Sequence, residues 1–183
     1  MFDVDDLIER CRAALAEPEP RLAVRDALAG AVARPSDVES ALPLHRAEIE
    51  RLHAAAELTV IKVVWAPGMT IPPHDHRMWA AIGIYAGQED NALYRRSGTS
   101  IEQSGGRRLE EGDVVLLGDD AIHSVTNPRA GLTGAIHVYG GDFFGVARSE
   151  WPPPDFVERP HDGLAAARYF EAAEAARTDR PAG

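Results

Sequence analysis

The chain has 183 residues and a mass of 19.8 kDa, about the size of one globular domain with little room for a second. Hydrophobic residues make up 45% and charged residues 26%, which excludes a disordered or fibrous chain. Acidic residues outnumber basic residues by 29 to 19, so the net charge of −10 disfavours nucleic acid and anionic membrane surfaces as partners. No apolar run approaches the roughly 20 residues that span a bilayer.

The N-terminal segment lacks the basic and then apolar layout of a signal peptide, so we expect a soluble, cytoplasmic protein. Cys11 is the only cysteine, which excludes an intramolecular disulfide and a thiolate metal cluster within one chain. Any metal must therefore be held by His, Asp or Glu side chains.

Residues 1–55 are expected to form a helical layer. Apolar residues recur at steps of three and four between residues 3 and 33, with a Pro-Glu-Pro break at 18–20, which predicts two short helices. Ser36 and Glu39 have the spacing of a capping box. They predict a third helix that reaches about His53, with an interruption at Pro43.

Residues 56–150 are expected to form a β domain, because runs rich in β-branched and aromatic residues alternate with Gly, Pro, Asn and Asp. Such short strands are typical of a sandwich, a barrel or a jelly roll. Turns are expected at 87–91 and 105–106. Residues 151–183 should hold a Pro-rich segment, a helix over Leu164–Arg177 and loose final residues. Strands are predicted near Leu58–Trp65, His74–Ala86, Ala92–Arg96, Ser100–Gln103, Asp113–Leu117, His123–Thr126 and Leu132–Tyr139.

Four of the seven histidines fall within the predicted β region, at His74, His76, His123 and His137. Side chains at i and i+2 of a strand point to the same face, so His74 and His76 would present two imidazoles side by side. His123 begins another predicted strand, and a barrel that joins the two strands would complete a three-nitrogen metal site. Considered alone, a His-x-His pair is more commonly a solvated strand end and His123 a turn residue.

The sequence around this pair resembles the first motif of the cupin superfamily. Gly68-x5-His74-x-His76, followed by Gly87, has the spacing of that motif. Ala80 stands where the family has a glutamate ligand.

The second cupin motif is resembled by Gly112-x5-Gly118-x-Asp120-x2-His123-x3-Asn127, in which Gly118 and Asp120 replace the usual proline and second glycine. The resemblance covers about residues 58–140. It implies an α+β, mainly β chain that forms a single cupin domain over residues 1–183. This domain would be a double-stranded β-helix, or jelly roll, with N-terminal helices and a C-terminal helix.

The lack of a carboxylate at Ala80 leaves a divalent ion on three neutral imidazoles with its full charge, which favours an anionic co-ligand such as a thiolate. The thiol dioxygenases are cupins with this ligand set. Trp65, the His-Asp-His pair and His137-Val-Tyr139 resemble their cysteine and mercaptopropionate dioxygenase branch. The resemblance implies Fe(II) on the three histidines and catalytic roles for His137 and Tyr139, the tyrosine adjusting protonation beside bound oxygen.

Two positions depart from that branch. The serine of its Ser-His-Tyr relay is matched by Ala135, so His137 would need another hydrogen-bonding partner. Ala81 stands where mammalian members carry a cysteine that crosslinks the tyrosine, so Tyr139 should be unmodified. Without the resemblance, His137 and Tyr139 are as readily interpreted as residues of a core strand whose polar tips hydrogen-bond inside the barrel.

A substrate carboxylate would ordinarily be held by an arginine, which offers a planar, bidentate fork. The family's N-terminal arginine is not matched, since its place falls at Glu48. Arg77 directly follows His76 and should face the opposite side. The candidates are Arg46, Arg51, Arg77, Arg95, Arg96 and Arg129.

These features together predict a non-haem Fe(II) dioxygenase that oxidises a small cysteine- or mercaptopropionate-like thiol with O2 to a sulfinate, as a monomer or a homodimer. Two alternatives stay open. One is a cupin metalloenzyme of another reaction class that uses Ni, Mn, Zn or Fe. The other is a non-catalytic cupin that binds a small ligand.

Overall fold

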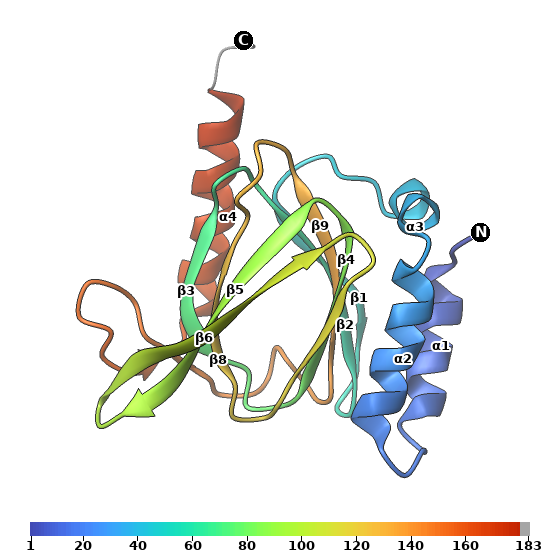
Figure 1. Cartoon of the computed structure of the whole chain (residues 1–183), viewed down its shortest axis with the longest axis horizontal. Helices are drawn as coiled ribbons and strands as arrows, with labels where there is room; N and C mark the ends of the chain where they lie inside the picture. The colour runs from blue at the N-terminus through green and yellow to red at the C-terminus, as the bar shows by residue number, and fades with distance from the viewer. Residues whose placement is uncertain (180–183) are drawn as a thin grey trace.

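Two antiparallel sheets enclose the core of the protein in a computed structural model that describes residues 1–179 (Figure 1). The strand order is β1-β2-β9-β4-β7 in one sheet and β11-β10-β3-β8-β5-β6 in the other. Neighbouring strands come from distant parts of the chain, as in β2 with β9 and β3 with β8, which is the connectivity of a jelly roll. The longer strands are β1 (Glu48–Ala54), β2 (Thr59–Trp65), β3 (Thr70–Asp75), β4 (Ala80–Ala86), β5 (Gln88–Ser97), β6 (Ser100–Glu110), β7 (Val114–Leu117), β8 (Ile122–Thr126) and β9 (Thr133–Tyr139).

Helices cover the sheets at both ends of the chain. The N-terminal helices α1 (Val4–Ala14), α2 (Pro20–Val32) and α3 (Pro35–Ala41) form a layer beside the first sheet, where α2 packs on β4 and β7 and α3 on β4 (Figure 1). The C-terminal helix α4 (Gly163–Thr178) contacts β3 of the second sheet. Two short strands, β10 (Ser149–Glu150) and β11 (Arg159–Pro160), extend that sheet before α4 begins. The predicted α+β, mainly β class with helices at both ends is confirmed.

Strands β2, β4 and β9 are buried along their whole length, because both faces of the first sheet are covered. Alternate residues such as Ile61 and Ala135 belong to the core between the sheets. The residues between them, such as Val60 and Val138, pack with the N-terminal helices. Side chains at i and i+2 of β9 therefore reach the barrel interior together.

The prediction that residues 48–53 continue a helix is wrong. These residues form β1, which pairs with β2 from Glu48 opposite Val64 to Ala54 opposite Thr59. Pairing with an adjacent strand outweighs the local helix propensity of Glu, Arg, Leu and Ala. The third helix ends at Ala41, and its N-cap is Arg34 without a side-chain hydrogen bond, so the expected capping box does not form.

Three predicted boundaries within the β region also differ. The expected single strand His74–Ala86 is divided between β3 and β4, and Arg77 lies in the intervening segment with a φ of 57°. Residues 88–91 and 105–106, expected as turns, lie inside β5 and β6, where a register shift accommodates the glycines. Only Gly87 of the first group turns, with a φ of 77° and the backbone of Thr133 3.1 Å from where a Cβ would lie. The residues expected to be loose, 180–183, lie outside the described range.

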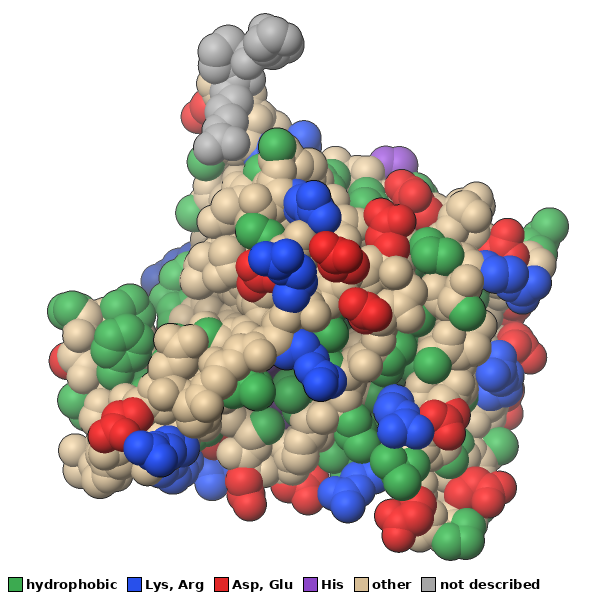
Figure 2. Space-filling view, viewed as in Figure 1, with side chains coloured by type: hydrophobic (Ala, Val, Ile, Leu, Met, Phe, Trp, Pro, Cys, Tyr) green, Lys and Arg blue, Asp and Glu red, His purple; other side chains and the backbone are tan. Residues whose placement is uncertain are grey.

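No helix among residues 1–179 is both long enough and apolar enough to cross a bilayer. On the face shown in Figure 2, Lys and Arg side chains lie among acidic side chains and form no continuous basic surface.

Candidate metal centre

The structure brings His74, His76 and His123 together inside the barrel. His74 is in β3 directly opposite His123 in β8, and His76 follows just after the end of β3. The Nε2 atom of His76 lies 3.2 Å from Nε2 of His74 and 3.2 Å from Nε2 of His123. One nitrogen from each ring lies within 4.8 Å of the others, so a single ion could be held by all three.

Burial keeps these imidazoles neutral. It lowers the pKa of His74 to about 3, although the hydrogen bond to the Pro72 carbonyl opposes the change. Burial, followed by repulsion from neighbouring imidazoles, lowers the pKa of His76 and His123 well below the ordinary value of 6.5. Neutral imidazole is the form that binds transition metals, so the residues present fit a divalent ion such as Fe, Zn or Ni.

No carboxylate joins the histidine cluster within residues 1–179. Ala80, at the position where cupins carry a glutamate ligand, is fully buried. Asp75, between the two histidines of the pair, faces away from the cluster: its Oδ2 lies 2.7 Å from Nε of Arg77 and its Oδ1 accepts the Ser149 N–H at 2.7 Å. A divalent ion held here would keep its full positive charge for an anionic ligand.

The metal-free protein is expected to lose stability as the pH falls from about 6.5 toward 3. In this window the unfolded histidines bind protons while the buried, folded ones remain neutral, so protonation favours unfolding. The slope should reach roughly 1.4 kcal/mol per pH unit for each such histidine. Urea unfolding at several pH values checks this, and His123→Gln should give a shallower dependence. An equal slope in the variant would contradict it.

Hydrogen bonds at Nδ1 orient two of the three rings. Nδ1 of His74 lies 3.0 Å from the Pro72 carbonyl, and Nδ1 of His123 lies 2.6 Å from Oδ1 of Asn91. In each case the acceptor oxygen places the ring proton on Nδ1 and leaves Nε2 with a free lone pair for a metal. Nδ1 of His76 has no hydrogen-bond partner among the described residues.

His137 and Tyr139 extend from β9 into the same interior. The tyrosine hydroxyl lies 3.0 Å from Nδ1 of His137, and the ring of Tyr139 packs edge-on against His76 with 5.0 Å between centroids. Burial raises the pKa of Tyr139, and the charge of Arg148 partly offsets this, so the hydroxyl keeps its proton at neutral pH. The pair can therefore hold a proton beside a ligand of the metal centre.

Glu89 is a site residue that the sequence analysis did not identify. It is fully buried in β5, and its Oε2 accepts the indole N–H of Trp65 at 2.9 Å. Its Oε1 accepts the amide N–H of Asn91 at 3.0 Å, and Oε2 lies 3.6 Å from Nε2 of His137. The sequence Gln-Glu-Asp-Asn after Gly87 was interpreted as a turn, which concealed the alternation that directs Glu89 and Asn91 inward.

A cavity of about 790 Å3 opens beside the histidines. Its walls are mainly apolar, and α4 closes one side by stacking Phe170 on Trp65 with 5.4 Å between ring centroids. His161 also lines it and lies 3.0 Å from a Glu150 carboxylate oxygen. The apolar wall residues include Ile61, Val63, Ile71, Val125 and Phe143.

Arg148 is the second residue that the sequence analysis missed. It lines the cavity with its guanidinium 3.9 Å from the centre of the Phe143 ring, and this guanidinium makes no hydrogen bond or ion pair with any residue in 1–179. Burial lowers its pKa, and the charge of nearby acidic groups opposes this. A guanidinium in a cavity without a carboxylate partner is a ready site for an anion. The pattern Ala-Arg-Ser in a loop gave no signal for it.

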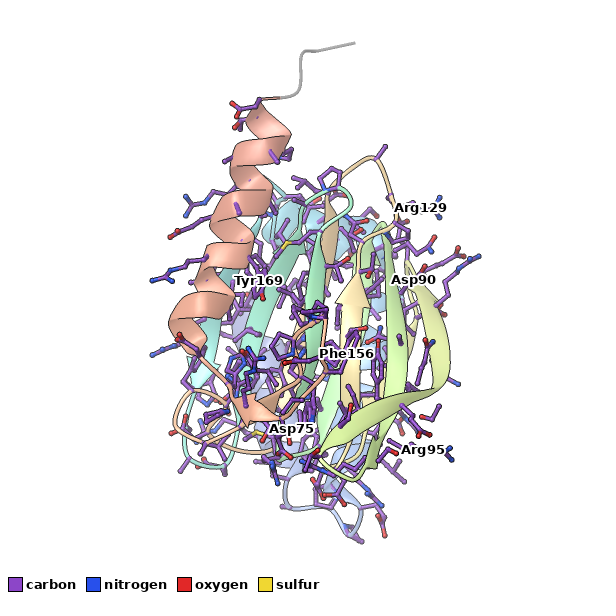
Figure 3. The ribbon with its side chains drawn as sticks, turned by 90° about the vertical axis from the view of Figure 1, so that its left-hand side faces the viewer. Asp75, Asp90, Arg95, Arg129, Phe156 and Tyr169 are labelled. Carbon is purple, nitrogen blue, oxygen red and sulfur yellow. The ribbon has the colours of Figure 1, made fainter. Side chains whose placement is uncertain are left out.

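The six arginines considered from the sequence have different surroundings. Arg46 and Arg51 line the outer cavity, where Arg46 pairs with Glu48. Arg77 and Arg96 pair with Asp75 on the side away from the histidines, as expected for Arg77. The others pair with glutamates and lie on the side of the molecule away from α4, where Figure 3 labels Arg95 and Arg129.

Comparisons with solved structures concern the fold. No known family model matches the chain. A Bacillus halodurans protein is similar with a TM-score of 0.53 at 14% identity, over 72% of this chain and 91% of that one. A cupin with a double-stranded β-helix from Methanocaldococcus jannaschii gives 0.47 at 15% identity, over 55% and 85%. The fold is that of the cupins. An oxalate oxidase in complex with glycolate gives 0.41 at 16% identity, over 51% of this chain and 50% of that chain.

Proposed function

We propose that the protein is an Fe(II)-dependent dioxygenase that oxidises a thiol bearing an anionic group, with His74, His76 and His123 as the metal ligands. The observation that carries the proposal is the convergence of three neutral imidazoles, with no carboxylate from residues 1–179 among them. Such a ligand set leaves a full positive charge that favours a thiolate. The Tyr139 hydroxyl beside His137 supports a proton-dependent step at the same place.

The reaction is the addition of both atoms of one O2 molecule to the sulfur of a thiol, giving a sulfinic acid. Sulfur supplies all four electrons that reduce O2, so no further reductant is required. When bound, Fe(II) supplies open coordination positions and the redox chemistry that lets O2 react with sulfur.

The side chains of the cavity bind and orient the substrate. Arg148 would hold the anionic group, since its guanidinium has no other partner among residues 1–179. Tyr139 would accept a hydrogen bond from the substrate thiol through its hydroxyl oxygen, because its own proton is donated to Nδ1 of His137. Phe143 and Phe170 limit the access of water to the reacting group.

The size of the cavity bears on the choice of thiol. A volume of about 790 Å3 is in the range that holds drug-sized ligands, and most of the wall is apolar. The cavity therefore accommodates thiol acids with an apolar body as well as cysteine and mercaptopropionate. The substrates to be compared should include cysteine, mercaptopropionate and thiol acids with a larger apolar body. Cysteamine, which has no acid group, should be included as well.

The test is oxygen consumption by protein loaded anaerobically with Fe(II) and supplied with this thiol panel. We expect a sulfinate product that carries two 18O atoms when 18O2 is used, and no turnover by the zinc-loaded protein. An iron-loaded, folded protein that turns over no member of the panel would contradict the thiol proposal. Elemental analysis of protein purified without added metal would distinguish the proposed iron dioxygenase from the alternative, a cupin metalloenzyme that uses Ni, Mn or Zn.

A further inference from the structure

A buried carboxylate connects the proposed metal ligands to the His137–Tyr139 pair. We infer that Glu89 is a positioning residue that fixes the hydrogen-bond direction, and so the proton position, on both His123 and His137. The inference rests on the proposed function only in taking the three histidines as metal ligands. It also identifies a charged neighbour of His137, at 3.6 Å, in a protein where position 135 is an alanine and offers no hydroxyl.

One set of contacts runs from Glu89 through Asn91 to His123. The direction of its hydrogen bonds follows from the donors available. The amide N–H of Asn91 donates to Oε1 of Glu89 at 3.0 Å, so the NH2 end of Asn91 faces the Glu89 side chain. The carbonyl end of Asn91 must then face His123, where its Oδ1 lies 2.6 Å from Nδ1. An amide oxygen can only accept, so the proton of His123 is on Nδ1 and its Nε2 is free to bind a metal.

The other set of contacts runs from Glu89 to His137 and then to Tyr139. Oε2 of Glu89 is held by the indole N–H of Trp65 at 2.9 Å and lies 3.6 Å from Nε2 of His137. That distance is too long for a hydrogen bond, but at this burial the negative charge favours the proton on the nearer ring nitrogen. Nε2 of His137 has no hydrogen-bond partner among the described residues. Nδ1 is then the acceptor for the Tyr139 hydroxyl at 3.0 Å.

The burial of this network makes the arrangement difficult to replace. Glu89 is 0% exposed, and Asn91, His123 and His137 are 4%, 1% and 3% exposed, so water cannot substitute for a lost partner. Each polar atom that loses its hydrogen-bonding partner here destabilises the folded state by the full free energy of its desolvation. A neutral amide at position 89 has one accepting end only, so it cannot satisfy Asn91 and Trp65 together.

The first test is Glu89→Gln, with Zn2+ affinity measured by competition with a chelator. We expect affinity to fall about 10- to 100-fold, the range for losing the group behind a metal-binding histidine. Histidine 15N NMR of the metal-free protein should show the His123 proton leaving Nδ1 in part. The matched control is Asp90→Asn, the same chemical change at the next residue, which is labelled on the side away from α4 in Figure 3. Its Zn2+ affinity should be unchanged.

The second test uses the double variant Glu89→Gln/Asn91→Asp, which exchanges the positions of the carboxylate and the amide. The amide at 89 can then donate to the carboxylate at 91, which still accepts from Nδ1 of His123, while the amide oxygen accepts from Trp65. We expect Zn2+ affinity to return to within a few-fold of the unmodified protein, which a purely structural role of Glu89 would not predict.

Two results would overturn the inference. One is a folded Glu89→Gln protein with unchanged Zn2+ affinity and unchanged histidine tautomers. The other is an exchanged pair that fails to fold or binds Zn2+ no better than Glu89→Gln. Neither measurement involves a thiol, so failure of the proposed oxidation is recognised separately, by the absence of turnover.

Discussion

Replacing His76 with Ala is expected to weaken binding of Fe(II) or Zn2+ by more than about 100-fold, since loss of a ligand exceeds the 10- to 100-fold cost of losing the group behind one. His76 is central because its Nε2 lies 3.2 Å from the corresponding atom of both other histidines. The two that remain cannot form a three-nitrogen site, and Ala80 supplies no ligand nearby. Chelator competition measures the loss, and oxygen consumption with any thiol should disappear with it.

Thermal denaturation provides a second readout of the same variant. Zn2+ at 100 times its dissociation constant should stabilise the unmodified protein by about 2.7 kcal/mol, because the ion binds the folded state. The same Zn2+ concentration should stabilise His76→Ala by less than about 0.4 kcal/mol, because its affinity is more than about 100-fold weaker. The matched control is His45→Ala, at an exposed position that does not belong to the histidine cluster, which should respond like the unmodified protein. Equal metal stabilisation of both variants would show that these histidines are not the ligands.

Replacing Arg148 with Gln is expected to raise KM for a thiol acid by about 100-fold, with a smaller change in kcat. Losing one partner of a buried charge pair typically costs about 2–5 kcal/mol, and a factor of ten corresponds to about 1.4 kcal/mol. Arg148 is suited to this pairing because it stacks on Phe143 in the cavity and has no ion-pair partner within residues 1–179. Steady-state oxygen consumption with mercaptopropionate measures the effect.

Cysteamine and a surface arginine serve as controls for this variant. Cysteamine has no carboxylate, so its KM should stay the same or fall once the cation is removed. Arg95→Gln removes an arginine that pairs with Glu102 on the outer surface, and it should leave both constants unchanged. A similar rise in KM for cysteamine and for the acid would mean that Arg148 shapes the cavity and does not bind the anionic group.

Local spacing was sufficient to predict several parts of this protein. The change from helical periodicity to β-branched runs near Leu58 predicted the helical and β portions of the chain. The i, i+2 spacing of His74 with His76 and of His137 with Tyr139 predicted that each pair would share a side, because strand geometry alone decides this. The outward direction of Arg77 was predicted on the same basis, and its ion pair with Asp75 agrees.

Other parts were decided by which strands lie next to each other. His123 meets His74 because β8 pairs with β3 in one register, although the two are 49 positions apart in the chain. Residues 48–54 are a strand because β2 offers a free edge, despite a helix-like composition. Glu89 and Arg148 gave no local signal, since a sequence does not distinguish a buried charged side chain from one on the surface. The chain pattern thus determines which way neighbouring side chains point, whereas long-range pairing determines which distant side chains meet and which charges are removed from water.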